Sequence, residues 1–236
     1  MSASAVEGGG GAGVAALSAE GLEAVALEEG KVVAGGTVTA QVSDRDFPNL
    51  GTVSAKKKPV CTALAAVQAG SVLGEPASVV RRMWLGPQET SEADLGADPS
   101  DEELANAALD STTSFVSLAS YEQRAAKAVM ADIGRAVEEC ASGFVYTAAG
   151  EDPVETVKVR KAAAPTGLRG ADEVVAATLT VEVGGAKGPV EVVVVRHGGT
   201  IGYFPATSLA SQATGDAFTL PAALVQAQLT RLTKTG

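Results

Sequence analysis

Apolar residues recur at helical spacing in four segments of the chain. The clearest is 122–143, where apolar side chains three and four positions apart share one helix face: Ala126, Val129, Ile133, Val137 and Cys140. Shorter versions of the same spacing occupy 18–29, 60–70 and the residues that follow Pro221. Ser18 and Pro221 are residue types that commonly begin helices. The pattern therefore predicts about three to four helices.

Other segments alternate apolar with polar or small residues, which is the period of a β-strand. These segments are 36–44, 77–86, 113–121, 144–150, 154–162, 173–183, 189–197 and 200–204. In 173–183 the apolar side chains fall on alternate positions, which predicts a sheet with one face in water. Short turns that contain glycine separate the last three strands, so we expect an antiparallel meander there. Helices and strands together predict an α+β domain.

The chain divides into parts by composition. Residues 1–16 are rich in glycine and alanine, which is typical of a flexible tether. Residues 17–236 carry the predicted elements and are expected to form one domain. Within it, 88–110 holds many acidic side chains and no basic one. Such a block is well solvated and repels itself, so we expect an exposed excursion. It lacks the alternating ligand frame of a calcium loop.

Charge and hydropathy exclude several classes of partner. Hydrophobic residues make up 46% of the 236 residues, which is typical of a folded protein. The net charge of -10 argues against nucleic acid or an anionic lipid surface as the main partner, because both bind basic faces. The sequence contains no 18-residue apolar run, so it predicts no membrane span.

Cys61 and Cys140 are the two cysteines of the chain, and both fall on predicted helices. Together with His197, the single histidine, they are too few for a structural zinc site, which needs four ligands. We therefore expect no metal, and a disulfide that joins the two helices is the preferred interpretation. In the loop-entropy treatment such a bridge contributes about 4 to 5 kcal/mol. Two buried free thiols in a cytosolic protein are the alternative.

Sequence signatures of catalysis are mostly missing. Gly8, Gly10 and Gly13 match a dinucleotide-binding pattern as a string, but no strand precedes them, so we assign them to the tether. His197 lies beside two glycines in a predicted turn, where an exposed histidine is the common outcome. A disulfide-bonded cysteine cannot act as a nucleophile. The sequence therefore predicts no enzymatic activity and no cofactor.

Basic and aromatic residues are the remaining candidates for a binding function. The lysines at 56–58 and the arginines at 81–82 are expected to pair mainly with acidic groups of the same chain. Successive strand residues point to opposite faces, so Arg82 and Trp84 share a face. Four polar or aromatic residues on strands or strand ends are predicted to line a ligand cleft: Arg82, Trp84, Tyr121 and Tyr203.

The order of these elements resembles the extracellular sensor-like domains of actinobacterial membrane serine/threonine kinases of the PknH type and of related lipoproteins. The resemblance is carried by a D-x-P-type turn near a strand, a cysteine that opens a helix in PVCTALA, a second cysteine that ends a longer helix in AVEEC, and a closing antiparallel sheet. It covers residues 17–233. It implies a twisted antiparallel sheet packed against helices, with a cleft for a small molecule or a cell-wall component. Such domains often carry a second disulfide, for which this chain has no cysteines, and the resemblance transfers no catalytic residue.

We therefore expect a non-catalytic, extracytoplasmic ligand-binding or sensor-like domain. It would be secreted, or held at the cell surface by a lipid anchor that has been removed from this sequence. The ligand would be a small molecule or a cell-envelope component, bound to the sheet beneath the disulfide-linked helices. One alternative is a protein-interaction module of the cell envelope that uses the sheet face or the acidic segment 88–110. A second alternative is a hydrolase with a carboxylate site in that segment.

Overall fold

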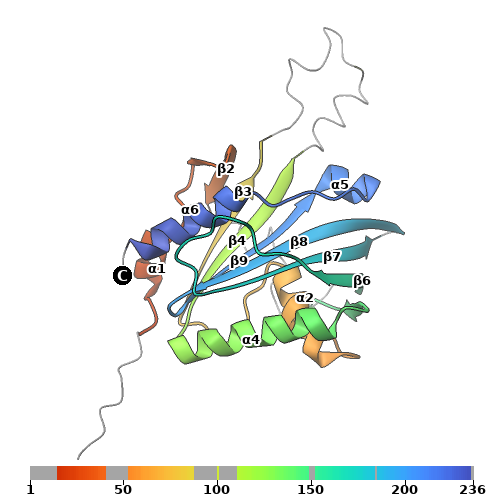
Figure 1. Cartoon of the computed structure of the whole chain (residues 1–236), viewed down its shortest axis with the longest axis horizontal. Helices are drawn as coiled ribbons and strands as arrows, with labels where there is room; N and C mark the ends of the chain where they lie inside the picture. The colour runs from red at the N-terminus through yellow and green to blue at the C-terminus, as the bar shows by residue number, and fades with distance from the viewer. Residues whose placement is uncertain are drawn as a thin grey trace, which may run out of the picture.

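The structure is a computed structural model that describes residues 15–40, 53–87, 100, 111–148, 152–183 and 185–234. It has an α+β fold in which helices pack on one antiparallel sheet (Figure 1). The strands are β1 (Val32–Val33), β2 (Gly36–Ala40), β3 (Ser78–Leu85), β4 (Thr112–Ser120), β5 (Phe144–Tyr146), β6 (Val154–Lys161), β7 (Glu173–Val183), β8 (Ala186–His197) and β9 (Thr200–Ser208). The helices are α1 (Ala19–Val25), the 3-10 turn η1 (Pro59–Cys61), α2 (Thr62–Gln68), α4 (Gln123–Glu139), α5 (Leu209–Thr214) and α6 (Ala222–Thr233).

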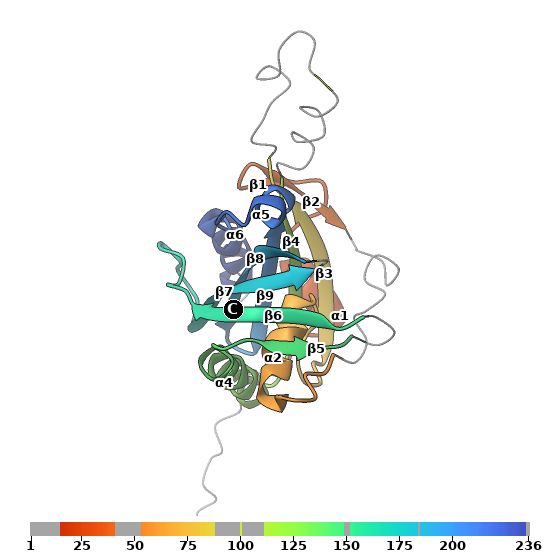
Figure 2. The same cartoon turned by 90° about the vertical axis from the view of Figure 1, so that its right-hand side faces the viewer.

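The sheet consists of two antiparallel meanders that meet in its centre. Its strand order is β1-β2-β3-β4-β9-β8-β7-β6-β5, so β4 of the first meander pairs with β9 of the second. The pairs β7–β8 and β8–β9 are antiparallel, which confirms the predicted meander of the last three strands. Figure 2 views the molecule from the edge formed by β6 and β5.

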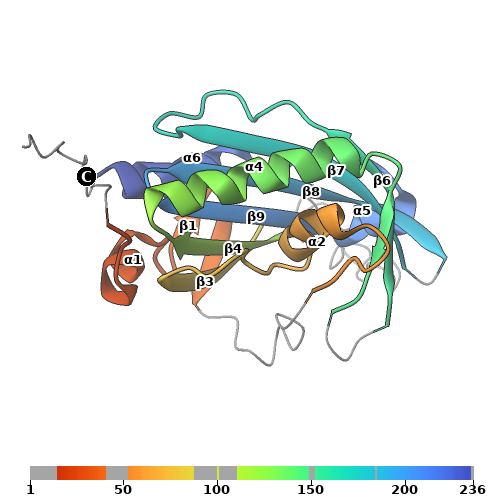
Figure 3. The same ribbon diagram turned by 90° about the horizontal axis from the view of Figure 1, so that it is seen from below.

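Helix α4 crosses one face of the sheet and connects the two meanders. It begins after β4 in the middle of the sheet, ends before β5 at the edge, and contacts β6, β7, β8 and β9 (Figure 3). Helix α2 packs beside it on this side, which we call the α4 face. Leu64, Ile133 and Leu179 are fully buried between the two helices and the sheet. The helical stripe predicted for 122–143 therefore faces the core.

The opposite side of the sheet is covered by α1 and α6, and we call it the α6 face. Trp84, Phe204 and Leu224 are fully buried there. Ala176 of β7 is buried in this core, whereas its neighbour Ala177 is buried in the core of the α4 face. The prediction that one face of this strand lies in water is therefore wrong for this part of β7. Residues of α6, which is remote in sequence, cover the second face.

Local capping explains where several helices begin and end. The Ser18 side chain accepts a hydrogen bond from the Gly21 backbone N–H, and α1 begins at the next residue, as the sequence predicts. Helix α5 is a short helix that the apolar spacing did not predict. The Ser208 side chain caps its start, and Gly215, with a φ of 79°, ends it in the left-handed region that favours glycine.

The predicted disulfide between Cys61 and Cys140 is present, with the two Cα atoms 5.9 Å apart. Its position differs in one respect from the prediction that it joins two helices. Cys61 is the last residue of η1, and Cys140 is the residue that follows the last turn of α4. The bridge therefore links a 3-10 turn to a helix C-terminus. Both cysteines are fully buried in the core of the α4 face.

Several predicted features lie wholly or mostly outside the described residues. They are the tether, of which only 15–16 are described, the D-x-P-type turn, which lies at 46–51, and the acidic segment 88–110 apart from Ser100. In the described part of the chain, none of the helices has both the length and the apolar character needed to cross a membrane.

Candidate functional site

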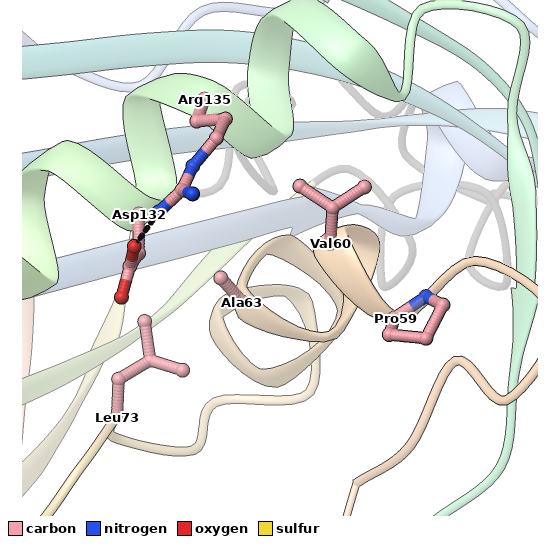
Figure 4. Close-up of a pocket in the computed structure, with 6 residues that line it drawn as sticks. All are labelled: Pro59, Val60, Ala63, Leu73, Asp132 and Arg135. Atoms are coloured by element: carbon pink, nitrogen blue, oxygen red, sulfur yellow. Dashed lines mark hydrogen bonds and ion pairs between the residues drawn. The ribbon is translucent and has the colours of Figure 1, made fainter.

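A groove of about 350 Å³ lies between α4 and the segment formed by η1 and α2 (Figure 4). It is lined by Pro59, Val60, Ala63, Leu73, Asp132 and Arg135. Val60, Ala63 and Leu73 are partly exposed and pack against the core of the α4 face, so they form an apolar floor. The acidic and basic side chains both come from α4. The groove therefore combines an apolar floor with a charged rim.

The rim consists of an ion pair between Asp132 and Arg135, which lie about one turn apart on α4. Their side chains are 54% and 57% exposed, so water screens the pair and its contribution to stability is small. The guanidinium of Arg135 offers several N–H donors, and the Asp132 carboxylate offers two acceptor oxygens. A ligand with a polar group can therefore replace one partner of this pair at little energetic cost.

The disulfide lies directly beside the groove. Cys61 follows the groove residue Val60 in η1, and its partner Cys140 lies just beyond α4. The bond thus fixes the wall made by η1 to the helix that carries Asp132 and Arg135. A groove held in this way needs little reorganisation when a ligand enters, which lowers the entropic cost of binding.

Tyr121 and Tyr203 support the groove from below. The Tyr121 hydroxyl donates a hydrogen bond of 2.7 Å to the backbone carbonyl of Leu73, which lines the groove. Because its proton is used there, its oxygen accepts from the Tyr203 hydroxyl, 2.9 Å away. Burial raises the pKa of both Tyr121 and Tyr203 above the ordinary value of 10.0. Both hydroxyls are therefore neutral donors throughout the physiological range.

The raised pKa values predict a loss of stability in alkaline solution. In the unfolded chain both tyrosines ionise near pH 10, whereas in the folded protein burial keeps Tyr121 and Tyr203 protonated to higher pH. Their contribution to the free energy of unfolding is therefore complete below pH 10 and is lost as the pH rises further, by about 1.4 kcal/mol per pH unit for each tyrosine. Tyr203→Phe should make this decline less steep. Urea unfolding of both proteins from pH 8 to 11 measures it, and equal slopes would contradict the prediction.

The four residues predicted to line a cleft lie on two sides of the sheet. Tyr121 and Tyr203 are buried on the α4 face, beneath the groove, and Trp84 is buried on the α6 face. Trp84 donates from Nε1 to the backbone carbonyl of Val33, 2.8 Å away. The four residues therefore do not line one common cleft, and the groove is lined by other residues.

Arg82 also lies on the α6 face, where it holds the chain that follows α1. Its Nε donates to the backbone carbonyl of Leu27 over 3.1 Å, and it forms an ion pair with Glu23. This intramolecular pairing is what the sequence predicts for Arg82. The neighbouring Arg81 differs, because its Nε is buried and has no hydrogen-bond partner among the described residues.

His197, the other candidate for chemistry, is partly exposed at the end of β8. Its Nδ1 lies 2.7 Å from the backbone carbonyl of Gly170, at hydrogen-bond distance. Neither Asp132 nor Arg135 is among the site residues predicted from the sequence. A signal for them was present, because opposite charges three positions apart on a predicted helix form a surface pair. Nothing in the sequence indicated that the loop around Leu73 would lie beside this pair.

The fold and the groove define a disulfide-bonded α+β domain whose antiparallel sheet carries helices on both faces. Among solved structures, the crystal structure of the extracellular domain of PknH from Mycobacterium tuberculosis is similar to it. The TM-score is 0.48 and the sequence identity 10%, over 93% of this chain and 96% of that chain. The resemblance inferred from the sequence is therefore supported only as a loose similarity of fold. No family model and no curated protein matches the chain.

Proposed function

We propose that this protein is a non-catalytic, extracytoplasmic domain that binds a small molecule or a cell-envelope component in the groove between α2 and α4. The observation that carries the proposal is the groove itself. Its volume of about 350 Å³ falls in the range of small-molecule sites, and it joins an apolar floor to a few polar groups, as such sites do. A molecule with an apolar body and a polar end fits this arrangement.

The disulfide supports an extracytoplasmic location. Disulfides form and persist in oxidising compartments and are rare in the cytosol. Both cysteines of this chain are joined in one bridge, and the bridge is fully buried in the core. We therefore propose that the protein is exported, and that it is either secreted or held at the cell surface by an anchor.

The state of the reactive side chains favours binding over catalysis. Both cysteine sulfurs are bonded to each other, so neither is available as a nucleophile, and His197 is not among the residues that line the groove. The charged groups of the groove, Asp132 and Arg135, are exposed to water and paired with each other. Catalytic acids and bases are usually buried in a cleft or placed beside a like charge. The groove is therefore proposed to recognise its ligand without changing it.

Native mass spectrometry of protein purified from its own host tests this function. We expect a retained small-molecule mass that disappears on mild unfolding. Ala63→Trp should abolish the adduct, because the indole would fill the apolar floor of the groove. Ala128→Trp is the matched control, because Ala128 is exposed on α4 and does not line the groove. An adduct retained by the Ala63→Trp variant would place the ligand elsewhere.

A weaker variant tests the role of the groove support. Tyr121→Phe removes the hydrogen bond to the Leu73 carbonyl but leaves every groove side chain in place. It should reduce adduct occupancy without abolishing it.

If the wild-type protein carries no adduct but copurifies with a protein partner, the interaction module replaces the ligand-binding domain as the better proposal.

A further inference from the structure

A second cavity lies on the other flank of α4, between this helix and the ends of β6 and β7. Its volume is about 270 Å³. It is lined by Gly134, Val137, Lys161, Ala162, Ala164, Val174, Val175 and Ala176. These side chains are small or apolar, with the single exception of Lys161. The cavity shares no lining residue with the groove between α2 and α4.

Gly134 is the most informative residue of this cavity. It lies in the interior of a helix of 17 residues, where glycine is less favourable than alanine because it loses more conformational freedom on folding. Close packing does not require glycine here, because a Cβ atom at this position would meet nothing within 4 Å. At Gly143, by contrast, a Cβ would lie 2.3 Å from the Thr156 carbonyl oxygen. The missing side chain at 134 therefore leaves open space in the wall of the cavity.

Lys161 supplies the single ionisable group among the lining residues. Its Nζ lies 3.4 Å from Glu138 Oε1, and the two side chains are 72% and 68% exposed. Such an exposed pair contributes little to stability, so a ligand carboxylate can take the place of Glu138 at low cost. An apolar wall with one cation at its edge is complementary to an aliphatic chain that ends in a carboxylate. The cavity has the volume of roughly nine water molecules at about 30 Å³ each, which is enough for a short aliphatic chain.

We propose that this cavity is a second binding site, which takes a short aliphatic monocarboxylate. The hydrocarbon chain lies against Gly134, Val137 and Val175, and the carboxylate binds the Lys161 ammonium. The site is independent of the function proposed for the groove, since each can bind its ligand without the other.

Titration of the whole chain with hexanoate tests the proposal, with the methyl resonances of Val137 and Val175 as the NMR readout. We expect saturable shifts of these resonances. Gly134→Leu should abolish them by filling the cavity, while raising the thermal midpoint by about 2 to 4 °C, because leucine is the better helix former. If leucine distorts the fold, Gly134→Ala keeps the test decisive, because the added methyl should still weaken binding. Saturable binding that neither variant reduces would overturn the proposal.

The charge and the location of the site have separate controls. Lys161→Gln should weaken hexanoate about fivefold, whereas Lys158→Gln, at an exposed position of the same strand, should have no effect. Hexanol should bind the wild-type protein and the Lys161→Gln variant equally and more weakly than hexanoate binds the wild type. Ala63→Trp, which fills the groove, should leave hexanoate binding unchanged. Equal affinities of the wild type for hexanoate and hexanol, or no saturable shift at Val137 and Val175, would show that the proposal is wrong.

Discussion

Replacing both Cys61 and Cys140 with alanine should lower the free energy of unfolding by about 4 to 5 kcal/mol. The bridge closes a loop with a sequence separation of 79, and in the loop-entropy treatment its loss frees a correspondingly large part of the unfolded chain. That loss is a large share of the roughly 5 to 15 kcal/mol that stabilises a typical domain. Urea unfolding of the oxidised wild type and the double variant measures the difference.

Two comparisons separate the bridge from the side chains. The wild-type protein in strong reductant should lose nearly as much stability as the double variant, because both lack the cross-link. Reductant should leave the double variant unchanged. Loss of the bridge should also weaken the binding of any ligand in the groove, because η1 would no longer be fixed to the end of α4. A double variant within about 1 kcal/mol of the wild type would contradict a structural role for the bridge.

The elements of the fold could be predicted because their signals are local. The apolar stripe of α4 repeats every three to four residues, and the strands of the second meander alternate and are separated by turns. Ser18 caps the start of α1 with its side chain, and Pro221 is the residue immediately before α6. The disulfide could also be predicted, because the chain has one pair of cysteines and therefore one intramolecular pairing.

The order of the strands in the sheet could not be predicted from such local signals. Pairing of β4 with β9 brings together residues such as Ser117 and Tyr203, which are remote in sequence, and no turn between them reports the contact. The covering of the α6 face depends on α6, the last helix. Alternation along β7 predicts which residues share a face, but it does not reveal whether a helix will cover the second face.

The candidate site likewise has features that could be predicted from the sequence and features that could not. Tyr121 and Tyr203 were selected as rare polar aromatics, and the structure brings their hydroxyls together beneath the groove. The partner of the Tyr121 hydroxyl, the Leu73 carbonyl, is a backbone group, and every residue type has one. Arg82 and Trp84 likewise bind backbone carbonyls, in their case on the other face of the sheet. Residue type indicated which side chains need a partner, but only the fold shows which partner they have.

Gln228 is the strongest example of a contact that residue type alone does not reveal. It lies on α6 and is fully buried. Its Oε1 accepts from the Leu27 backbone N–H over 3.0 Å, and its Nε2 donates to the Val25 carbonyl over 2.8 Å. One amide thus satisfies both a donor and an acceptor in the chain that leaves α1. The Gln228 amide takes the place of the backbone partners that these two groups would have if α1 continued.

Gln228→Met should therefore lower the free energy of unfolding by about 2 to 6 kcal/mol. Methionine has a similar volume, so the packing of α6 is largely kept, but two buried backbone groups lose their partners at about 1 to 3 kcal/mol each. Gln226→Met is the matched control on the same helix. Gln226 is partly exposed where it bonds to Arg169, so water can replace its contacts, and the expected loss is below about 1 kcal/mol. Chemical denaturation of both variants decides the matter: equal losses would show that the buried amide of Gln228 does not join α1 to α6.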